Sequence, residues 1–434
     1  MSKATENKPD DAKYEAWRAE VDKLLKGADF DKRLVARTLE GIDVQPLYTA
    51  RDWPTEQDPG GFPGGPPYRR GALAIRRYGE GREMRPRYDN PDADKLREEI
   101  ADDLARGARS LWLGFDIGVR SGRSNVELPE DTAPFGAPCL SATQLGALLA
   151  DVPLERIAVS LDAGSNALAV AACFVHAATA RGIAATQLTG WLNADPLGAL
   201  ARDGALPYSL ESARVQLVAL GTWTAQHAAG LRAATVSAVP YHDAGAHAAQ
   251  ELAYALATGV SYLRWLCDSG LDVKAACSQL AFSFSVGTDF FMEVAKLRAM
   301  RQCWANVVAE CGGSAEAQIC VLHATTSTRT KTERDPWVNL LRETTEAFSA
   351  SVGGADAVTT GGFDRLFGPS ETFARRIAGN AQVILDEEAH VGRVADPAGG
   401  AWYVETLTDE LAQRAWALFQ RIEAGGGMQS ALES

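Results

Sequence analysis

The clearest pattern of hydrophobic positions in this chain runs from Leu280 to Trp304. Its first part, Leu280 to Val286, joins aromatic, aliphatic and small residues, which is typical of a strand buried on both faces. Its second part has apolar residues at helical spacing with charges between them, namely Phe290, Phe291, Val294, Leu297, Trp304 and Val307. The pattern predicts a buried strand that passes through a short turn into an amphipathic helix.

Beyond Pro91, short apolar or β-branched runs alternate with helical segments, which is typical of βα units around a parallel sheet. Eight such strands would close a (β/α)8 barrel of the TIM type. We therefore predict an α/β fold with a (β/α)8 barrel, and a doubly wound open sheet is the alternative. The eight runs are 110–116, 157–162, 186–191, 234–239, 262–266, 280–285, 318–323 and 357–360.

In such a barrel the chemistry lies at the C-terminal ends of the strands. The candidate functional residues are therefore the polar ones at or just after the end of each run: Asp116, Asp162, Asn193, His242, Asp268, Asp289 and His323.

The part of the chain before the barrel divides into an arm and a linker. A charged helical pattern predicts a helix that packs on another surface, through Tyr14, Trp17, Val21, Leu24 and Leu25. Between Gln57 and Arg70, Pro and Gly are too frequent for a helix or a strand to persist. The predicted domains are an N-terminal helical arm at 1–40, an extended linker at 41–90, and a barrel with C-terminal helices at 91–434.

Composition narrows the class of protein. A net charge of −13 argues against a nucleic-acid or anionic-membrane surface, because both require clustered Lys and Arg. The seven cysteines are scattered without a C-x-x-C pair, and the polar start of the chain does not resemble a signal peptide. No run approaches the roughly 20 apolar residues of a membrane span. We expect a cytoplasmic protein.

Generic catalytic motifs are absent from the sequence. The six histidines form no H-E-x-x-H and are not interleaved with Cys at ligand spacing, so no metal site is predicted. No G-x-S-x-G, P-loop or G-x-G-x-x-G follows a predicted strand.

Four stretches, in order along the chain, resemble the methylmalonyl-CoA mutase family. They are Pro46-Leu-Tyr-Thr-Ala-Arg-Asp-Trp53, which resembles a CoA-entry motif, Phe290-Phe-Met-Glu-Val-Ala-Lys-Leu-Arg298 with Trp304, Ala374-Arg-Arg-Ile-Ala-Gly-Asn-Ala-Gln382, and Val394-Ala-Asp-Pro-Ala-Gly-Gly-Ala-Trp-Tyr-Val-Glu405. The resemblance implies a barrel that admits an acyl-CoA chain, followed by a flavodoxin-like domain for adenosylcobalamin, and a radical rearrangement of acyl-CoA thioesters.

The CoA-entry motif implies that Tyr48 and Arg51 bind substrate or CoA. The same resemblance places an Arg and a Tyr five and seven residues after Arg51 as a carboxylate clamp, but this chain has Glu56 and Asp58 there. Acidic side chains would repel a dicarboxylic acyl group. Arg202 falls near a second carboxylate-binding position of the family.

Two histidines match positions close to the chemistry in the family. Val239-Pro-Tyr-His-Asp-Ala-Gly-Ala246 resembles the family stretch whose His acts as a partial general acid on the thioester carbonyl, which implies a catalytic or vestigial role for His242. His323-Ala-Thr-Thr-Ser-Thr departs from the family's His-x-Gln-Thr-Ser-Gly, so His323 is a cofactor-binding candidate that lacks its neighbouring amide.

The printed sequence contains no D-x-H-x-x-G segment to ligate cobalt, so we expect no flavodoxin-like cobalamin domain in this chain and no tight cofactor of its own. These departures are similar to those of the small, non-catalytic subunit of heterodimeric methylmalonyl-CoA mutases. That resemblance implies a mostly structural barrel beside a catalytic large subunit, with adenosylcobalamin present in the complex.

Two alternatives stay open. The first is an active mutase barrel for a non-dicarboxylic acyl-CoA that uses a separate cobalamin-binding protein. The second is a non-enzymatic acyl-CoA-binding or assembly protein.

Overall fold

The computed structural model describes residues 11–53, 58–75, 82–122, 136–139 and 141–433. Its centre is a parallel sheet of nine short strands in the order β3-β11-β10-β9-β8-β7-β6-β5-β4. The strands are β3 (Glu83–Met84), β4 (Arg87–Tyr88), β5 (Ser110–Gly114), β6 (Ala158–Asp162), β7 (Gly190–Ala194), β8 (Leu231–Ser237), β9 (Leu280–Val286), β10 (Leu322–Thr326) and β11 (Ala357–Thr359).

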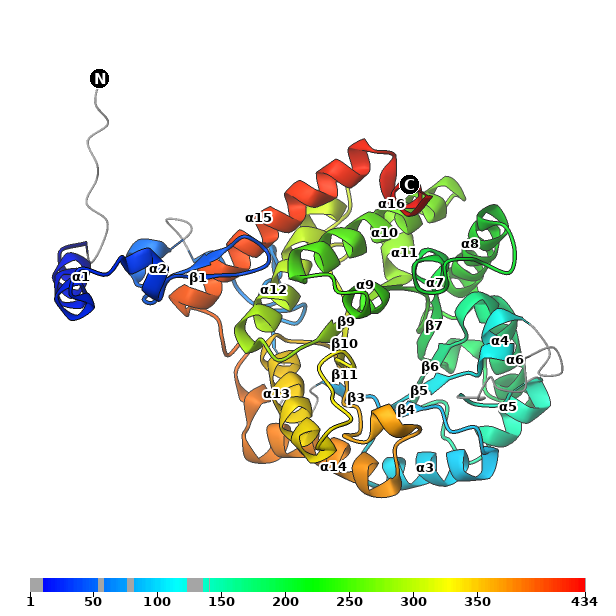
Figure 1. Ribbon diagram of the computed structural model, residues 1–434. Helices are drawn as coiled ribbons and strands as arrows, with labels where there is room; N and C mark the ends of the chain where they lie inside the picture. Colours follow the sequence, from blue (N-terminus) through cyan, green and yellow to red (C-terminus); the bar gives the residue numbers. More distant parts are fainter. Residues whose placement is uncertain (1–10, 54–57, 76–81, 123–135, 140, 434) are drawn as a thin grey trace.

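β3 and β4 are the two edges of this order, yet only Arg85 and Pro86 separate them in the chain. β3 pairs with β11, and the Arg85 N–H continues this ladder by donating to the Val358 carbonyl at 2.9 Å. On the other side β4 pairs with β5, and the Pro86 carbonyl accepts from Trp112 N at 3.0 Å. One interrupted strand therefore joins both edges, and the sheet closes as an eight-position barrel (Figure 1). The (β/α)8 prediction is confirmed, and the doubly wound alternative is excluded.

One predicted strand is wrong. The run 262–266 lies within the long helix α10 (Ala248–Asp268), which buries Tyr262, Leu263 and Leu266. A short apolar run cannot be assigned to strand or helix by periodicity alone, and here the helical pattern on its N-terminal side continues through it. The strand that completes the barrel is β3 with β4, and its residues come from the range expected as linker.

Helices surround the sheet (Figure 1). Those of the barrel are α3 (Ala93–Ala105), α4 (Ile117–Ser121), α5 (Ala142–Leu148), α6 (Ala167–Ala180), α7 (Pro196–Asp203), α8 (Leu210–His227), α9 (Val239–Asp243), α10, α11 (Val273–Ser278), α12 (Phe290–Glu310), α13 (Asn339–Val352) and α14 (Thr372–Val383). After them come α15 (Trp402–Ala424) and α16 (Gly427–Glu433).

β9 and α12 confirm the predicted strand and helix at Leu280 to Trp304. All of β9 is buried, and Trp304 meets Phe282 of β9 edge to face, with 4.8 Å between ring centroids. The amphipathic character is not as predicted, because Lys296, Arg298 and other charged residues of α12 are buried too. α15 packs over this helix and supplies carboxylates such as Glu405, whose Oε1 accepts from Arg298 at 2.5 Å.

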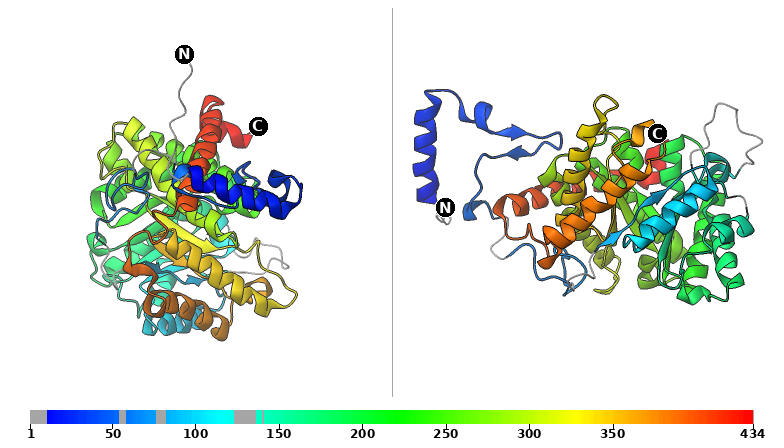
Figure 2. Two further views of the ribbon diagram at one scale, coloured as in Figure 1. Left: turned by 90° about the vertical axis from the view of Figure 1, so that its left-hand side faces the viewer. Right: turned by 90° about the horizontal axis from the view of Figure 1, so that it is seen from below.

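The N-terminal arm consists of α1 (Asp11–Leu25), α2 (Phe30–Leu34) and a two-stranded antiparallel pair, β1 (Ala36–Arg37) and β2 (Asp43–Val44). Figure 1 and the right-hand view of Figure 2 show α1 and α2 standing away from the barrel. α1 confirms the predicted helix, and it has no buried residue. The described residues 58–75 contain neither helix nor strand, as their Pro and Gly content predicts. Among the described helices, none combines the length and the apolar character that crossing a membrane requires.

Candidate active site inside the barrel

A cavity of about 600 Å³ lies inside the barrel. The strands contribute small hydroxyl side chains to its wall, so bulky apolar residues do not fill the interior. Residues of this kind are Ser160, Thr235, Ser237, Ser283, Ser285, Thr325 and Thr359. Guanidinium groups also line it, and those of the strands, α4, α7 and the β11–α14 connection are Arg85, Arg87, Arg120, Arg202 and Arg365.

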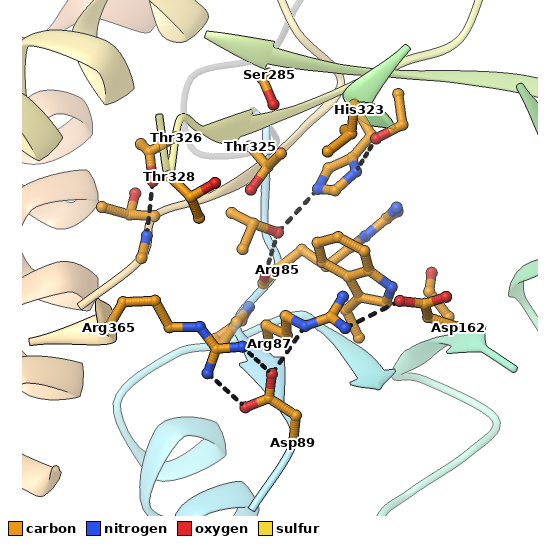
Figure 3. Close-up of a pocket in the computed structure, with 18 of the residues that line it drawn as sticks. Arg85, Arg87, Asp89, Asp162, Ser285, His323, Thr325, Thr326, Thr328 and Arg365 are labelled. Atoms are coloured by element: carbon orange, nitrogen blue, oxygen red, sulfur yellow. Dashed lines mark hydrogen bonds and ion pairs between the residues drawn. The ribbon is translucent and has the colours of Figure 1, made fainter. Parts of the chain in front are cut away.

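An ion-pair network crosses one side of this cavity (Figure 3). Arg87 donates from Nε to Asp89 at 3.0 Å and from Nη2 to Asp162 at 2.9 Å. Arg365 donates to both carboxylate oxygens of Asp89. Burial alone would raise the pKa of Asp89 and Asp162, but the facing guanidiniums outweigh it and lower both. Both carboxylates are therefore ionised at neutral pH.

His323 lies on β10 and lines the cavity, but both of its ring nitrogens are engaged within the barrel. Thr359 donates its hydroxyl to the Arg85 carbonyl at 2.6 Å, so it must accept from His323 Nε2–H at 2.8 Å. Nδ1 then accepts from the Ser283 hydroxyl at 3.0 Å. Burial, together with Arg85 and Arg87, holds the pKa of His323 well below its ordinary value. His323 is neutral, and in this arrangement it offers no lone pair to a group outside the barrel.

His242 lies on α9, is buried, and is not part of the cavity wall. Its Nδ1 is 2.9 Å from Glu251 Oε1 and its Nε2 is 2.7 Å from the Ser327 hydroxyl. Glu251 is bound in turn by Lys296 Nζ at 2.9 Å. Burial alone would raise the pKa of Glu251, but the effects of Lys296 and His242 are larger together, so the pKa is below its ordinary value. His242 is held within a buried polar network, and its action on a thioester stays a prediction.

Tyr48 and Arg51 lie in the linker range, shortly after β2, and do not line the cavity. The Tyr48 ring packs on Tyr403 with centroids 5.0 Å apart, and its hydroxyl accepts from Gln45 N at 3.1 Å. Arg51 lies over the ring of Tyr14 at 3.7 Å. The described structure thus separates these two CoA-binding candidates from the interior of the barrel, and their role stays a prediction.

Arg202 lines the cavity. Its guanidinium donates two hydrogen bonds to the carboxylate of Asp203, both at 2.8 Å. Asp58 is held by Arg70 Nη2 at 2.7 Å and does not line the cavity. Glu56 lies outside the described residues.

The strand-end candidates other than His242 occupy three kinds of position. Asp162, Asn193 and His323 line the cavity. Asp116 and Asp289 instead cap helices, because their side chains accept from Val119 N and Met292 N. Asp268 is the last residue of α10, because the run 262–266 that was predicted to be a strand is part of this helix.

Sequence reasoning missed Arg87, Asp89 and Arg365, which form the centre of the ion-pair network. Arg87 and Asp89 belong to the interrupted first strand, where two residues on each side of Pro86 are too few to form a recognisable pattern. The only signal was the alternation of charged and uncharged residues in Arg85-Pro-Arg-Tyr-Asp89. Within the described ranges, no group of three His, Cys, Asp or Glu side chains could hold a metal ion.

Comparison with known proteins gives a family for this chain. The family model described as methylmalonyl-CoA mutase matches residues 37–434. The methylmalonyl-CoA mutase small subunit of Streptomyces virginiae is 42% identical over 98% of this chain and 65% of that protein. The small subunit of Propionibacterium freudenreichii subsp. shermanii is 35% identical over 97% of this chain and 63% of that protein. A probable small subunit of Mycobacterium tuberculosis (strain H37Rv) is 41% identical over 93% of this chain and 62% of that protein.

The chain therefore spans somewhat less than two thirds of the length of these relatives. A solved structure of Yersinia pestis DHPS, at 13% identity, covers 70% of this chain and 95% of its own with a TM-score of 0.33, too low to support any statement about this protein. The family match spans the arm's strand pair, the whole barrel and the final helices. The chain belongs to the methylmalonyl-CoA mutase family, and it is similar to small subunits of that enzyme.

Proposed function

We propose that this chain is a small-subunit-like component of an adenosylcobalamin-dependent methylmalonyl-CoA mutase, in which a catalytic large subunit interconverts methylmalonyl-CoA and succinyl-CoA. Its own site is degenerate and its role is structural. The observation that carries this proposal is the network of Arg87, Asp89, Asp162 and Arg365. Arg87 and Arg365, which could otherwise bind an acyl-CoA carboxylate, are neutralised by carboxylates of the chain itself.

The two histidines support the same conclusion. A general acid must reach its target within hydrogen-bond distance, but both nitrogens of His242 are used by Glu251 and Ser327 behind the cavity wall. His323 is neutral and bound at both nitrogens, so it does not fit a cobalamin site. We therefore assign adenosylcobalamin, which supplies the radical chemistry of the family, to the partner and not to this chain.

The arm supports a heterodimer. α1 has no buried residue, and Leu24 on it is 80% exposed. An apolar side chain on a helix that projects from its own barrel gains by packing on another chain. We propose that this surface wraps the large subunit, and that the complex is cytoplasmic.

The first alternative, an active barrel for a non-dicarboxylic acyl-CoA, has less support. It requires Glu56 and Asp58 to select the substrate. Asp58 pairs with Arg70 and is absent from the cavity wall.

The deciding experiment co-expresses this chain with a catalytic large subunit of methylmalonyl-CoA mutase. We expect the two to co-purify, and we expect mutase activity, measured as succinyl-CoA formed from methylmalonyl-CoA, only when the large subunit is present. The matched control supplies this chain alone with adenosylcobalamin. Turnover by the chain alone at an ordinary enzyme rate, about 1 per second or more, would overturn the proposal.

A variant separates a structural role from a hidden catalytic one. His242→Gln keeps a polar side chain among Glu251 and Ser327, so the complex should form and retain its activity. A loss of activity in a complex that still assembles would show that the barrel of this chain does chemistry.

A further inference from the structure

Five aromatic side chains form a continuous row on the outside of the barrel. Tyr48 packs on Tyr403 with ring centroids 5.0 Å apart, and Tyr403 meets Phe291 at 5.2 Å. Phe291 meets Phe290 at 5.2 Å, and Phe290 meets Phe348 at 4.9 Å. This aromatic row joins the segment after β2, the first turns of α15 and α12, and the C-terminal half of α13.

Part of the aromatic row faces solvent. Phe291 is 45% exposed and Phe348 is 38% exposed, although large aromatic rings are among the side chains that gain most from burial. Next to Tyr403 in the chain, Trp402 is 43% exposed as well. Single exposed apolar residues are ordinary, but a contiguous group of them marks an interaction site. The aromatic row therefore has the character of a contact surface.

The aromatic row continues into the arm. Arg51 follows Tyr48 by three positions and lies over the ring of Tyr14 on α1 at 3.7 Å. Arg51 also pairs with Asp11, the first residue of α1, at 3.9 Å. The first turn of α1 is thus held where the aromatic row begins, and the rest of the helix projects from the barrel, as the right-hand view of Figure 2 shows. A partner that packs on α1 lies directly beside the aromatic row.

The size of α1 gives a second reason to extend the contact onto the barrel. A stable, specific interface buries about 800 Å² on each partner. α1 has 15 residues, so it is roughly 22 Å long at about 1.5 Å per residue and about 10–12 Å wide. One face of such a helix falls short of that area, even with Leu24 as an anchor. Surface beside α1 must supply the remainder.

We propose that the aromatic row is the contact surface of the barrel for the catalytic large subunit, which α1 holds against it. This inference rests on the proposed function, because that proposal supplies the partner. The facing surface of the large subunit is apolar and covers the rings of Phe291 and Phe348, since aromatic residues dominate the energetic centres of interfaces.

A second exposed group, Trp337 and Phe367, lies on the connections that follow β10 and β11. Among the described residues, this group has no ring contact with the aromatic row, and so it lacks the continuity with the arm. The two groups therefore make different predictions for binding of the large subunit.

The test measures by calorimetry how tightly the full chain binds a catalytic large subunit of methylmalonyl-CoA mutase. Phe291→Asp places a charge in the contact and should weaken binding about thirtyfold or more, the effect of losing a dominant residue. Phe291→Tyr keeps the ring and should bind nearly as the unaltered chain does. Val215→Asp is the matched control and should not change affinity. Val215 is 54% exposed on α8, which lies on the side of the barrel away from the arm (Figure 1).

Thermal unfolding of each chain without its partner separates binding from folding. Phe291→Asp should melt within a few degrees of the unaltered chain, because the ring is partly exposed and an acidic residue is favourable in the first turn of a helix. If this variant does not fold, Phe348→Asp takes its place, and the same loss of affinity is expected.

Three results would overturn the inference while the unaltered chain still binds the large subunit. The first is unchanged affinity in both Phe291→Asp and Phe348→Asp. The second is a loss of affinity in Phe367→Asp alone, which would move the contact to the second exposed group. The third is self-association of the chain that Phe291→Asp abolishes and the large subunit does not displace, which would assign the aromatic row to a second copy.

In all three cases the proposed function stands, because the two subunits still form a complex. If the unaltered chain does not bind the large subunit at all, the proposed function fails and this inference fails with it. Calorimetry on the unaltered pair therefore distinguishes the two failures.

Discussion

At the scale of single residues, the hydrogen bonds inside the barrel are fixed because each polar atom has few possible partners. Thr359 illustrates this, because its one hydroxyl proton goes to the Arg85 carbonyl and its lone pair then fixes the tautomer of His323. Buried polar groups without partners are costly, so such chains of donors and acceptors are rigid. Such partners hold both ring nitrogens of His323, and its role as a cofactor-binding residue stays a prediction.

The pH dependence of stability tests the state of His323. Its pKa is well below the ordinary value in the folded chain, so below about pH 6.5 the unfolded chain binds more protons than the folded one. The free energy of unfolding therefore falls as the solution is acidified through this window. His323→Gln removes this titration, and its stability should depend less on pH between about pH 5 and 6.5. Urea denaturation at several pH values measures both curves.

Other groups titrate in the same window with the opposite sign. Burial raises the pKa of Asp195 to about 6 and that of Glu343 to about 7, so these two carboxyls favour the folded chain as pH falls. They contribute equally to both proteins and cancel in the difference. Parallel curves for the variant and the unaltered chain would contradict a neutral, buried His323.

At the scale of elements, β9 and α12 pack closely against each other through Phe282 and Trp304. Gly259 of α10 lies against them, since a Cβ there would come within 2.9 Å of Trp304 and 3.0 Å of Phe282. The aromatic pair therefore fills the space between sheet, α10 and α12 completely. Interiors packed in this way respond to small changes in volume.

Trp304→Ala should lower the free energy of unfolding by about 3–5 kcal/mol, because it leaves a cavity between Phe282 and Gly259. Chemical denaturation monitored by circular dichroism measures the loss. Trp402→Ala is the control, since Trp402 is 43% exposed, and its effect should be much smaller. Equal losses in the two variants would show that Trp304 does not fill the space between β9 and α10.

The outer side of α12 is joined to α15 by buried charges. Arg298 donates to Asp396 at 3.1 and 2.9 Å and to the hydroxyl of Thr408 at 3.0 Å, and it also reaches Glu405. Arg69 of the linker pairs with Glu405 and Asp409 as well. The network thus connects three segments that are distant in the chain. Its charged residues have all their partners only when the three segments pack together.

Arg298→Met should destabilise the protein by about 3–5 kcal/mol, because it leaves Asp396 and Glu405 buried with fewer partners. Adding Glu405→Leu should recover part of this loss, since it removes one of the stranded charges. Equilibrium unfolding in urea provides the comparison. Arg97→Ala, which breaks an exposed pair with Asp151, is the control and should cost less than about 1 kcal/mol. No recovery in the double variant would mean that Arg298 acts chiefly through packing.

At the scale of the whole molecule, α1 packs apart from the barrel, whereas Ile42 between β1 and β2 belongs to the core. The barrel closes on itself through β3 and β4, whereas α1 buries no residue. A deletion of residues 1–34 should therefore leave the melting temperature of the barrel nearly unchanged. It should weaken binding to the large subunit by about tenfold or more, as expected if apolar anchors are lost.

The deletion is best measured by co-purification and by calorimetry with the large subunit. Leu24→Ser is a milder variant, and it should weaken binding without altering the barrel. Unchanged affinity for the large subunit in both variants would rule out the arm as the contact, while leaving the family assignment intact.

The sequence by itself determined the features that depend on local pattern. The strand and helix at Leu280 to Trp304, the helix through Trp17, the irregular Pro-Gly segment and the family motifs all follow from periodicity or from runs of residues that can be read in order. These features can be predicted because a buried face or a rigid backbone restricts the residue types at neighbouring positions. The number of strands in the barrel was right for the same reason, although one of the eight was wrong.

Only the tertiary structure decided where the charges lie. The interrupted first strand is recognised by its pairing with β11 and β5, and Arg87 meets Asp162 across 75 positions of the chain. The charge of Arg298 on α12 looks exposed in sequence until Asp396 and, on α15, Glu405 supply its carboxylates about 100 residues later. An ion pair leaves no periodic trace in sequence, because its energy depends on distance and burial and not on spacing along the chain. The sequence therefore identified the scaffold, and the fold decided which of its side chains remain unpaired.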